Sequence, residues 1–243
     1  MKAVVVIPAR YGSTRFPGKP LADLDGKPLI EHVYRRACLA DVEDVIVATD
    51  DRRVEEAVLG FGGRCVMTDS SHRSGSDRLG EVARGLDAGI IVNVQGDEPL
   101  IDPEVIDAVI APLRGAAPPD IATVAVPIND NDHYGDRHVV KVVTDSEGTA
   151  LYFSRSPIPH GWKPGEGAAL RHVGIYAYGR EALLRFVSLP PGELELMEDL
   201  EQLRALENGM RIAVVTREGF TGIGVDRPED LERVLKIMLE ETF

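Results

Sequence analysis

Short runs of apolar, mostly β-branched residues alternate with segments of helical period in the first hundred residues of this chain. This alternation limits the fold more than any other feature. The runs Val4–Ile7, Val45–Thr49 and Ile90–Val94 contain no regular polar alternation, so both faces of each strand are expected to be covered. Between and around them lie three segments with apolar residues on one helical face: 28–39, 51–61 and 77–86. The pattern predicts a Rossmann-like α/β fold, with a mixed, mostly parallel sheet flanked by helices.

The middle of the chain, from Ile121 to Tyr178, is richer in strands than the rest. The predicted strands are 121–128, 139–144, 150–153 and 173–178. The turn residues Asp145–Gly148 predict a hairpin between the second and third of these. We therefore expect a smaller antiparallel lobe around residues 121–178, which serves acceptor binding or dimerisation, within a single domain of residues 1–243.

The last part of the chain returns to alternating helix and strand. A helix is predicted over Glu195–Asn208 with Gly209 after its end, followed by a strand over Arg211–Thr216 and a closing helix from Pro228. The Gly- and Pro-rich stretch Pro157–Gly167 is predicted to be a surface loop rather than a domain boundary.

Charge and hydropathy exclude some classes of partner. The formal net charge of −13 argues against nucleic acid, because phosphate backbones require a basic face. No apolar run approaches the roughly 20 residues that span a bilayer, and the opening run Ala3–Pro8 is too short for a signal peptide. We expect a cytoplasmic protein. Cys38 and Cys65 stand in apolar contexts and are expected to be packed thiols rather than ligands or a disulfide.

The loop after the first strand, residues 8–20, is rich in glycine and in cations. Arg10, Arg15 and Lys19 are close together in a chain that is acidic overall, and such a cluster favours an anionic ligand. It is not a Walker A loop, because five residues separate Gly12 from Gly18 and a proline follows the lysine. The alternative is a solvated basic turn.

Two aspartates are candidate ligands for a metal ion that bridges phosphates. Asp97 follows the strand Ile90–Val94, and the carboxyl ends of parallel strands are where open α/β sheets bind ligands. Asp226 precedes Arg227-Pro228, and taken alone it favours a cap of the last helix. A turn residue is the alternative for Asp97, and sequence chemistry alone does not pair the two carboxylates.

A further short segment, Ser74–Arg78, opens a predicted helix. Its backbone and Arg78 could read the edge of a nucleobase, or Ser74 could be a plain helix cap. Taken alone, the segment favours the cap.

Taken together, these segments resemble one family, the 3-deoxy-manno-octulosonate cytidylyltransferases (CMP-Kdo synthetases). The matching blocks follow the family's order over nearly the whole chain: RYGSTRFPGKPL (10–21), QGDEP (95–99), LYFSRSPIP (151–159), RHVGIY (171–176), LEQLRALENG (200–209) and GVDRPEDL (224–231). The resemblance implies a nucleotide-diphospho-sugar transferase fold. It also implies transfer of CMP from CTP to 3-deoxy-D-manno-octulosonate (Kdo), with release of pyrophosphate, for lipopolysaccharide synthesis.

The same resemblance implies roles for individual residues. Asp97 and Asp226 would bind magnesium. The triphosphate would be bound by Arg10, Arg15 and Lys19. The segment Ser74, Gly75 and Arg78, with Gln95, would lie near the cytidine. The acid sugar would be bound by five residues: Arg155, His172, Tyr176, Glu198 and Gln202. Glu198 and Gln202 are four residues apart, so we expect them on one helical face. A homodimer is also implied, whereas a membrane or nucleic-acid partner is not.

Three alternatives remain at this point. After Ile158-Pro159 the family commonly has an aromatic residue and an arginine, whereas this chain has His160–Lys163, so a related ulosonic acid such as 8-amino-Kdo is a second acceptor. Another sugar or polyol-phosphate nucleotidyltransferase would need cations for an acceptor phosphate. A catalytically inactive binding protein would usually have lost a metal carboxylate or the loop lysine.

Overall fold

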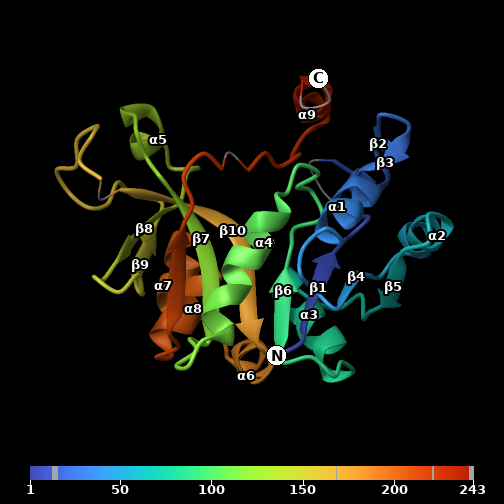
Figure 1. Ribbon diagram of the computed structural model, residues 1–243, viewed down its shortest axis with the longest axis horizontal. Coiled ribbons are helices and arrows are strands. Elements are labelled where there is room, and N and C mark those ends of the chain that lie inside the picture. The colour runs from blue at the N-terminus through green and yellow to red at the C-terminus, as the bar shows by residue number, and fades with distance from the viewer. Residues whose placement is uncertain (13–15, 168, 221, 241–243) are drawn as a thin grey trace. The chain divides into compact units, whose positions relative to one another are not determined.

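The chain forms two compact units, which are described separately. The structure is a computed structural model that describes residues 1–12, 16–167, 169–220 and 222–240 (Figure 1). The first unit contains residues 1–107 and the C-terminal segment from 221, and the second contains residues 108–220. The predicted antiparallel lobe around 121–178 falls within the second unit.

Unit 1 is built on four parallel strands in the order β6-β1-β4-β5 (Figure 1). The strands are β1 (Ala3–Pro8), β4 (Asp44–Thr49), β5 (Arg64–Met67) and β6 (Ile90–Asn93). Three of them confirm the predicted buried runs. β5 was not predicted, because it is short and its residues are partly exposed, so its sequence lacks the buried apolar run of the others.

Helices cover this parallel sheet. α3 packs on β1, β4 and β6, whereas α2 packs on β4 and β5. The helices of the unit are α1 (Leu29–Ala37), α2 (Arg52–Gly60), α3 (Gly75–Arg84), α4 (Pro103–Ile110, which continues into unit 2) and α9 (Pro228–Glu240). A short helix η1 (Lys19–Leu21) and a small hairpin of β2 (Asp23–Leu24) and β3 (Lys27–Pro28) complete it.

The C-terminal segment packs back onto unit 1 through an apolar cluster. Leu24 and Leu29 from the N-terminal part are buried against Val225 and Val234. This cluster fixes the stretch that carries Asp226, because Val225 is fully buried and its amide donates to the carbonyl of Asp97 at 2.8 Å.

Among its described residues, unit 2 contains a mixed set of five strands. β7 pairs in parallel with β11 and antiparallel with β10, whereas β8 pairs antiparallel with both β10 and β9. Their bounds are β7 (Ile121–Pro127), β8 (Lys141–Thr144), β9 (Ala150–Ser154), β10 (Leu170–Gly179) and β11 (Ile212–Thr216). The predicted hairpin at Asp145–Gly148 is confirmed as the β8–β9 turn. The helices are η2 (Ala111–Arg114), α5 (Asn131–Gly135), α6 (Arg180–Ser188), α7 (Glu193–Glu198) and α8 (Gln202–Glu207).

The single helix predicted over Glu195–Asn208 is wrong. The chain forms α7 and α8 instead, and Asp199 between them has a left-handed backbone with φ of 53°. The guanidinium of Arg155 donates to the carbonyls of Glu198 (2.8 Å) and Asp199 (3.1 Å), so these carbonyls have partners outside the helix. Glu198 and Gln202 therefore belong to different helices and do not share a helical face.

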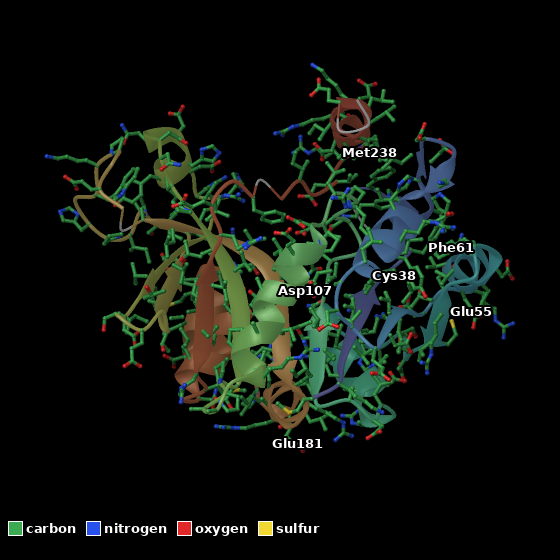
Figure 2. All side chains as sticks on the ribbon, in the orientation of Figure 1. Cys38, Glu55, Phe61, Asp107, Glu181 and Met238 are labelled. Atoms are coloured by element: carbon green, nitrogen blue, oxygen red, sulfur yellow. The ribbon has the colours of Figure 1, made fainter. Side chains whose placement is uncertain are left out.

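The cysteines are free thiols, as expected, but the prediction that both are packed is wrong for Cys38. That residue is exposed at the end of α1 (Figure 2), whereas Cys65 on β5 is half-buried. Burial raises the pKa of the Cys65 thiol to about 11, so it is protonated at neutral pH. In the part of the chain that the structure describes, no helix is long and apolar enough to cross a membrane.

Candidate active site

Lys19 is the centre of the candidate site in unit 1. Its ammonium donates to Asp97 Oδ2 at 2.6 Å and to the carbonyl of Val225 at 2.9 Å, and Asp226 Oδ1 lies 3.8 Å away. The predicted lysine and both predicted aspartates therefore converge, although they come from three distant parts of the sequence. The side chains of Lys19 and Asp97 are 16% and 30% exposed, so the ion pair is accessible to a ligand.

The loop before Lys19 is shaped by a tight turn. Gly18 has φ of 74° and donates its amide to the carbonyl of Tyr11 at 2.9 Å. A left-handed backbone at this point favours glycine, and a side chain here would also press on the ring of Tyr11. Arg15, predicted to hold the triphosphate, lies outside the described residues.

A cavity of about 420 Å³ opens beside Lys19 and Asp97. It is lined by Arg10, Gln95 and the pair Ser74-Gly75, whose predicted contact with nucleotide stays a prediction. Gly96 also lines it, and a Cβ there would lie 2.9 Å from the carbonyl oxygen of Pro8, so glycine allows the two strand ends to approach. Arg73 also lines the cavity, so the wall carries one more positive charge than the sequence predicted. Arg73 follows no recognisable motif, and only its position next to Ser74 could have indicated it.

Ser74 caps the start of α3, which confirms the simpler of the two interpretations of residues 74–78. Ser74 Oγ accepts the amide of Asp77 at 3.1 Å and the Asp77 carboxylate accepts the amide of Ser74 at 3.2 Å, which is a capping box. The N-terminus of α3 opens onto the cavity, and a helix N-terminus favours an anion.

Arg78 does not line the cavity. Its side chain is fully buried, donates to Asp50 Oδ2 at 2.8 Å and contacts Thr68. From this buried position Arg78 can hold the cavity wall in place. Its predicted contact with nucleotide stays a prediction.

The residues around Lys19 suit a magnesium ion that is shared with phosphate. Asp97 and Asp226 both reach one ammonium nitrogen, so their oxygens can approach one divalent cation. Among the described residues, no group of three or more His, Cys, Asp or Glu side chains could hold a metal alone. Two carboxylates with an incomplete ligand set are typical of Mg²⁺ that takes its other ligands from substrate phosphates and water.

In unit 2, two of the predicted acceptor residues lie together on β10. The rings of His172 and Tyr176 are 5.4 Å apart, and the β7–β10 register shifts between Val173 and Tyr176. The buried hydroxyl of Thr123 fills this irregularity, because it donates to the carbonyl of Ile175 at 2.7 Å and lies 2.9 Å from His172 Nε2. With the hydroxyl proton so used, Nε2 is assigned as the donor, which leaves Nδ1 as an acceptor.

Burial keeps both of these side chains neutral. It lowers the pKa of His172 to about 3, with a smaller effect from the charge of Arg171. Burial also raises the pKa of Tyr176 well above its usual value, with contributions from Tyr178 and the negative charge of Glu201. The pair can therefore serve as hydrogen-bonding groups, and not as charges, at neutral pH.

Arg155 and Glu198 are joined to each other rather than directed at a common ligand. The Glu198 carboxylate accepts from Ser154 Oγ at 2.6 Å and from the amide of Arg155 at 2.9 Å, whereas the Arg155 side chain donates to carbonyls at the end of α7. These contacts attach the end of β9 to α7. Their sugar-binding roles stay predictions.

Gln202 is another predicted acceptor residue with unused hydrogen-bonding capacity. It is 7% exposed, and among the described residues its Nε2 has no hydrogen-bond partner. Glu201 precedes it, and the influence of its charge on Tyr176 places it in the same neighbourhood. Glu201 was not predicted, because the family resemblance assigned Glu198 and Gln202 and gave Glu201 no role.

Comparison with known proteins identifies the family. The family model described as "Cytidylyltransferase" matches residues 4–212. The 3-deoxy-manno-octulosonate cytidylyltransferase of Geobacter metallireducens is 52% identical, over 97% of this chain and 97% of that protein. That of Solibacter usitatus is also 52% identical, over 97% and 94%. This chain belongs to the 3-deoxy-manno-octulosonate cytidylyltransferase family.

Solved structures agree with this family membership. A structure described as CMP:2-keto-3-deoxy-manno-octonic acid synthetase complexed with CTP superposes with a TM-score of 0.94 at 46% identity, over 99% of this chain and 100% of the other. A nucleotidyl transferase from Methanothermobacter is 19% identical with a TM-score of 0.66, which shows the shared fold alone. The predicted fold class, a mixed and mostly parallel sheet flanked by helices, is confirmed.

Proposed function

We propose that this chain transfers the CMP group of CTP to Kdo and releases pyrophosphate, with Mg²⁺ held by Asp97 and Asp226. The convergence of Lys19, Asp97 and Asp226 beside a cavity lined by cations carries the proposal. The names of the relatives and the CTP in the similar structure support the same substrates.

The reaction needs no protein nucleophile. The anomeric hydroxyl of Kdo attacks the α-phosphorus and forms a new oxygen–phosphorus bond. The bond between the α-phosphorus and the oxygen shared with the β-phosphate breaks, pyrophosphate leaves with that oxygen, and the hydroxyl proton passes to water. Lys19, Arg10 and Arg73 neutralise charge on the triphosphate and the departing pyrophosphate. Bound Mg²⁺ would add Lewis-acid stabilisation of the phosphate oxygens. Orientation of two bound substrates supplies the remainder of the acceleration.

The acceptor residues are proposed to act by neutral hydrogen bonding. His172 Nδ1 can accept from a sugar hydroxyl, whereas Gln202 Nε2 can donate to a sugar hydroxyl or to the sugar carboxylate. Tyr176 adds a ring and a hydroxyl that stays protonated.

Cellular context and assembly belong to the same proposal. The product would supply lipopolysaccharide synthesis in the cytoplasm. A homodimer is favoured by exposed apolar side chains on β9 and α7 of unit 2. These are Leu151, Leu196 and Met197. Sedimentation of the purified chain tests this assembly.

Pyrophosphate release is the test of the reaction. The chain would be incubated with Mg²⁺ and CTP, ATP, GTP or UTP, each with Kdo, 8-amino-Kdo or sialic acid. Release with CTP and Kdo is the expected result. Release with CTP and 8-amino-Kdo alone would keep the mechanism and replace the acceptor, and no release with any pair would refute the proposal.

A further inference from the structure

The loop that joins β9 to β10 is exposed along nearly all of its length. Between Ser156 and Gly167, Trp162 is the one buried residue, at 7% exposure. The residues on either side of it, Gly161 and Lys163, are exposed. This loop connects Arg155 at the end of β9 with β10, on which His172 and Tyr176 lie.

Trp162 is held by an aromatic contact and a small apolar cluster. Its ring lies 4.8 Å from that of Tyr134 on α5, and it packs with Ile128 and Ala169. The Tyr134 hydroxyl donates to the carbonyl of Pro159, which is in the same loop. We call Trp162 and Tyr134 the aromatic clamp, because together they fix the middle of the loop to α5.

A continuous set of contacts leads from the clamp to the acceptor residues. After α5, the carbonyls of Asp136 and Val139 accept from the buried ammonium of Lys141 at 2.8 and 2.6 Å. The same ammonium donates to the carbonyl of Arg155 at 2.6 Å. The amide of His172 donates to the carbonyl of Val140 at 2.8 Å. The segment that follows the clamp thus sets the backbone of two proposed acceptor residues.

We propose that the aromatic clamp of Trp162 and Tyr134 is a positioning device for the acceptor site, which holds Arg155 and His172 in their binding geometry through residues 136–141. The proposal rests on the proposed transfer to an acid sugar. Neither ring needs to touch the substrate. Loss of the clamp loosens the acceptor site and leaves the nucleotide cavity, which is built from residues of unit 1, unchanged.

Steady-state pyrophosphate release by Trp162→Ala and Trp162→Phe tests this inference. Because displacement of binding groups by about 1 Å is costly, Trp162→Ala should raise the KM for Kdo about tenfold or more, while the KM for CTP stays within about twofold. Trp162→Phe retains a ring against Tyr134 and should recover most of the loss. The matched control is Leu183→Ala, which removes a fully buried apolar side chain on α6 of unit 2. It should lower the melting temperature and leave the KM for Kdo unchanged.

Fluorescence gives a second measurement, because Trp162 is the single tryptophan of the chain. Tyr134→Leu should increase acrylamide quenching of Trp162 and raise the KM for Kdo together. An unchanged KM for Kdo in Trp162→Ala, or equal increases for Kdo and CTP, would overturn the inference while wild-type turnover upholds the proposed function. Absence of wild-type turnover with CTP and every acid sugar would instead refute the function and the inference with it.

Discussion

The proposed nucleotide cavity of unit 1 and the proposed acceptor residues of unit 2 hold their polar groups in opposite ways. Around the cavity, Lys19, Asp97 and Asp226 are partly exposed and form ion pairs that a metal ion and phosphates can replace. In unit 2, Arg155, Glu198 and His172 already have protein partners. The first region is arranged to exchange partners, whereas the second is arranged to keep a shape. Substitutions in the first region should therefore lower activity, whereas several in the second should lower stability.

The largest effect is expected at the carboxylates of unit 1. Asp97→Asn removes a charged ligand for a hard cation, and loss of such a contact should lower the rate of pyrophosphate release about 100-fold or more. The melting temperature should change little, because Asp97 is partly exposed. Glu181→Gln, a neutralised and exposed carboxylate on α6 (Figure 2), is the matched control and should retain full activity. Near-normal turnover by folded Asp97→Asn would refute the metal assignment.

Two neighbouring substitutions in unit 2 should separate binding from folding. Gln202→Leu removes an amide whose Nε2 makes no hydrogen bond among the described residues, so the KM for Kdo should rise about five- to tenfold, the equivalent of one hydrogen bond, without loss of stability. Glu198→Gln weakens the attachment of β9 to α7 and should cost about 1–3 kcal/mol of unfolding free energy. Thermal denaturation and acceptor titrations measure both. The reverse assignment, with Gln202→Leu unstable and Glu198→Gln affecting only KM, would contradict this division.

The last prediction concerns the pH dependence of stability. The pKa of His172 is about 3 in the folded chain and 6.5 in the unfolded reference, so the unfolded chain binds more protons between these values. The stability contribution of this residue is complete above about pH 6.5 and is lost as the pH falls toward 3. His172→Gln should flatten the fall in unfolding free energy between pH 6.5 and 4, measured by urea denaturation. An identical slope in both proteins would show that His172 is not held neutral.

Prediction from sequence worked best where local pattern and burial agree. The strands β1, β4 and β6 were predicted because short, β-branched apolar runs indicate buried strands. The loop of residues 8–20 was predicted to bind phosphate because three cations lie within ten residues of the chain, and this role stays a prediction. The pairing of Asp97 with Asp226 came from family resemblance, and the structure supplies its geometry through Lys19.

Prediction failed where distant residues decide a local structure. The break between α7 and α8 depends on Arg155, more than 40 residues earlier, which binds the carbonyls around Asp199. No helical period in residues 195–208 reveals this contact. Arg73 was missed for a related reason. It belongs to no sequence motif, and only the folded structure shows that it lines the cavity.

The connectivity of unit 1 has a consequence for synthesis on the ribosome. Unit 1 is interrupted by residues 108–220, and the segment with Asp226 returns to it only afterwards. A nascent chain thus carries Lys19 and Asp97 long before the second carboxylate has been translated. Products of premature termination before Asp226 would contain the cationic loop but one of the two carboxylates. The pair of carboxylates is therefore completed only after the whole of residues 108–220 has been translated.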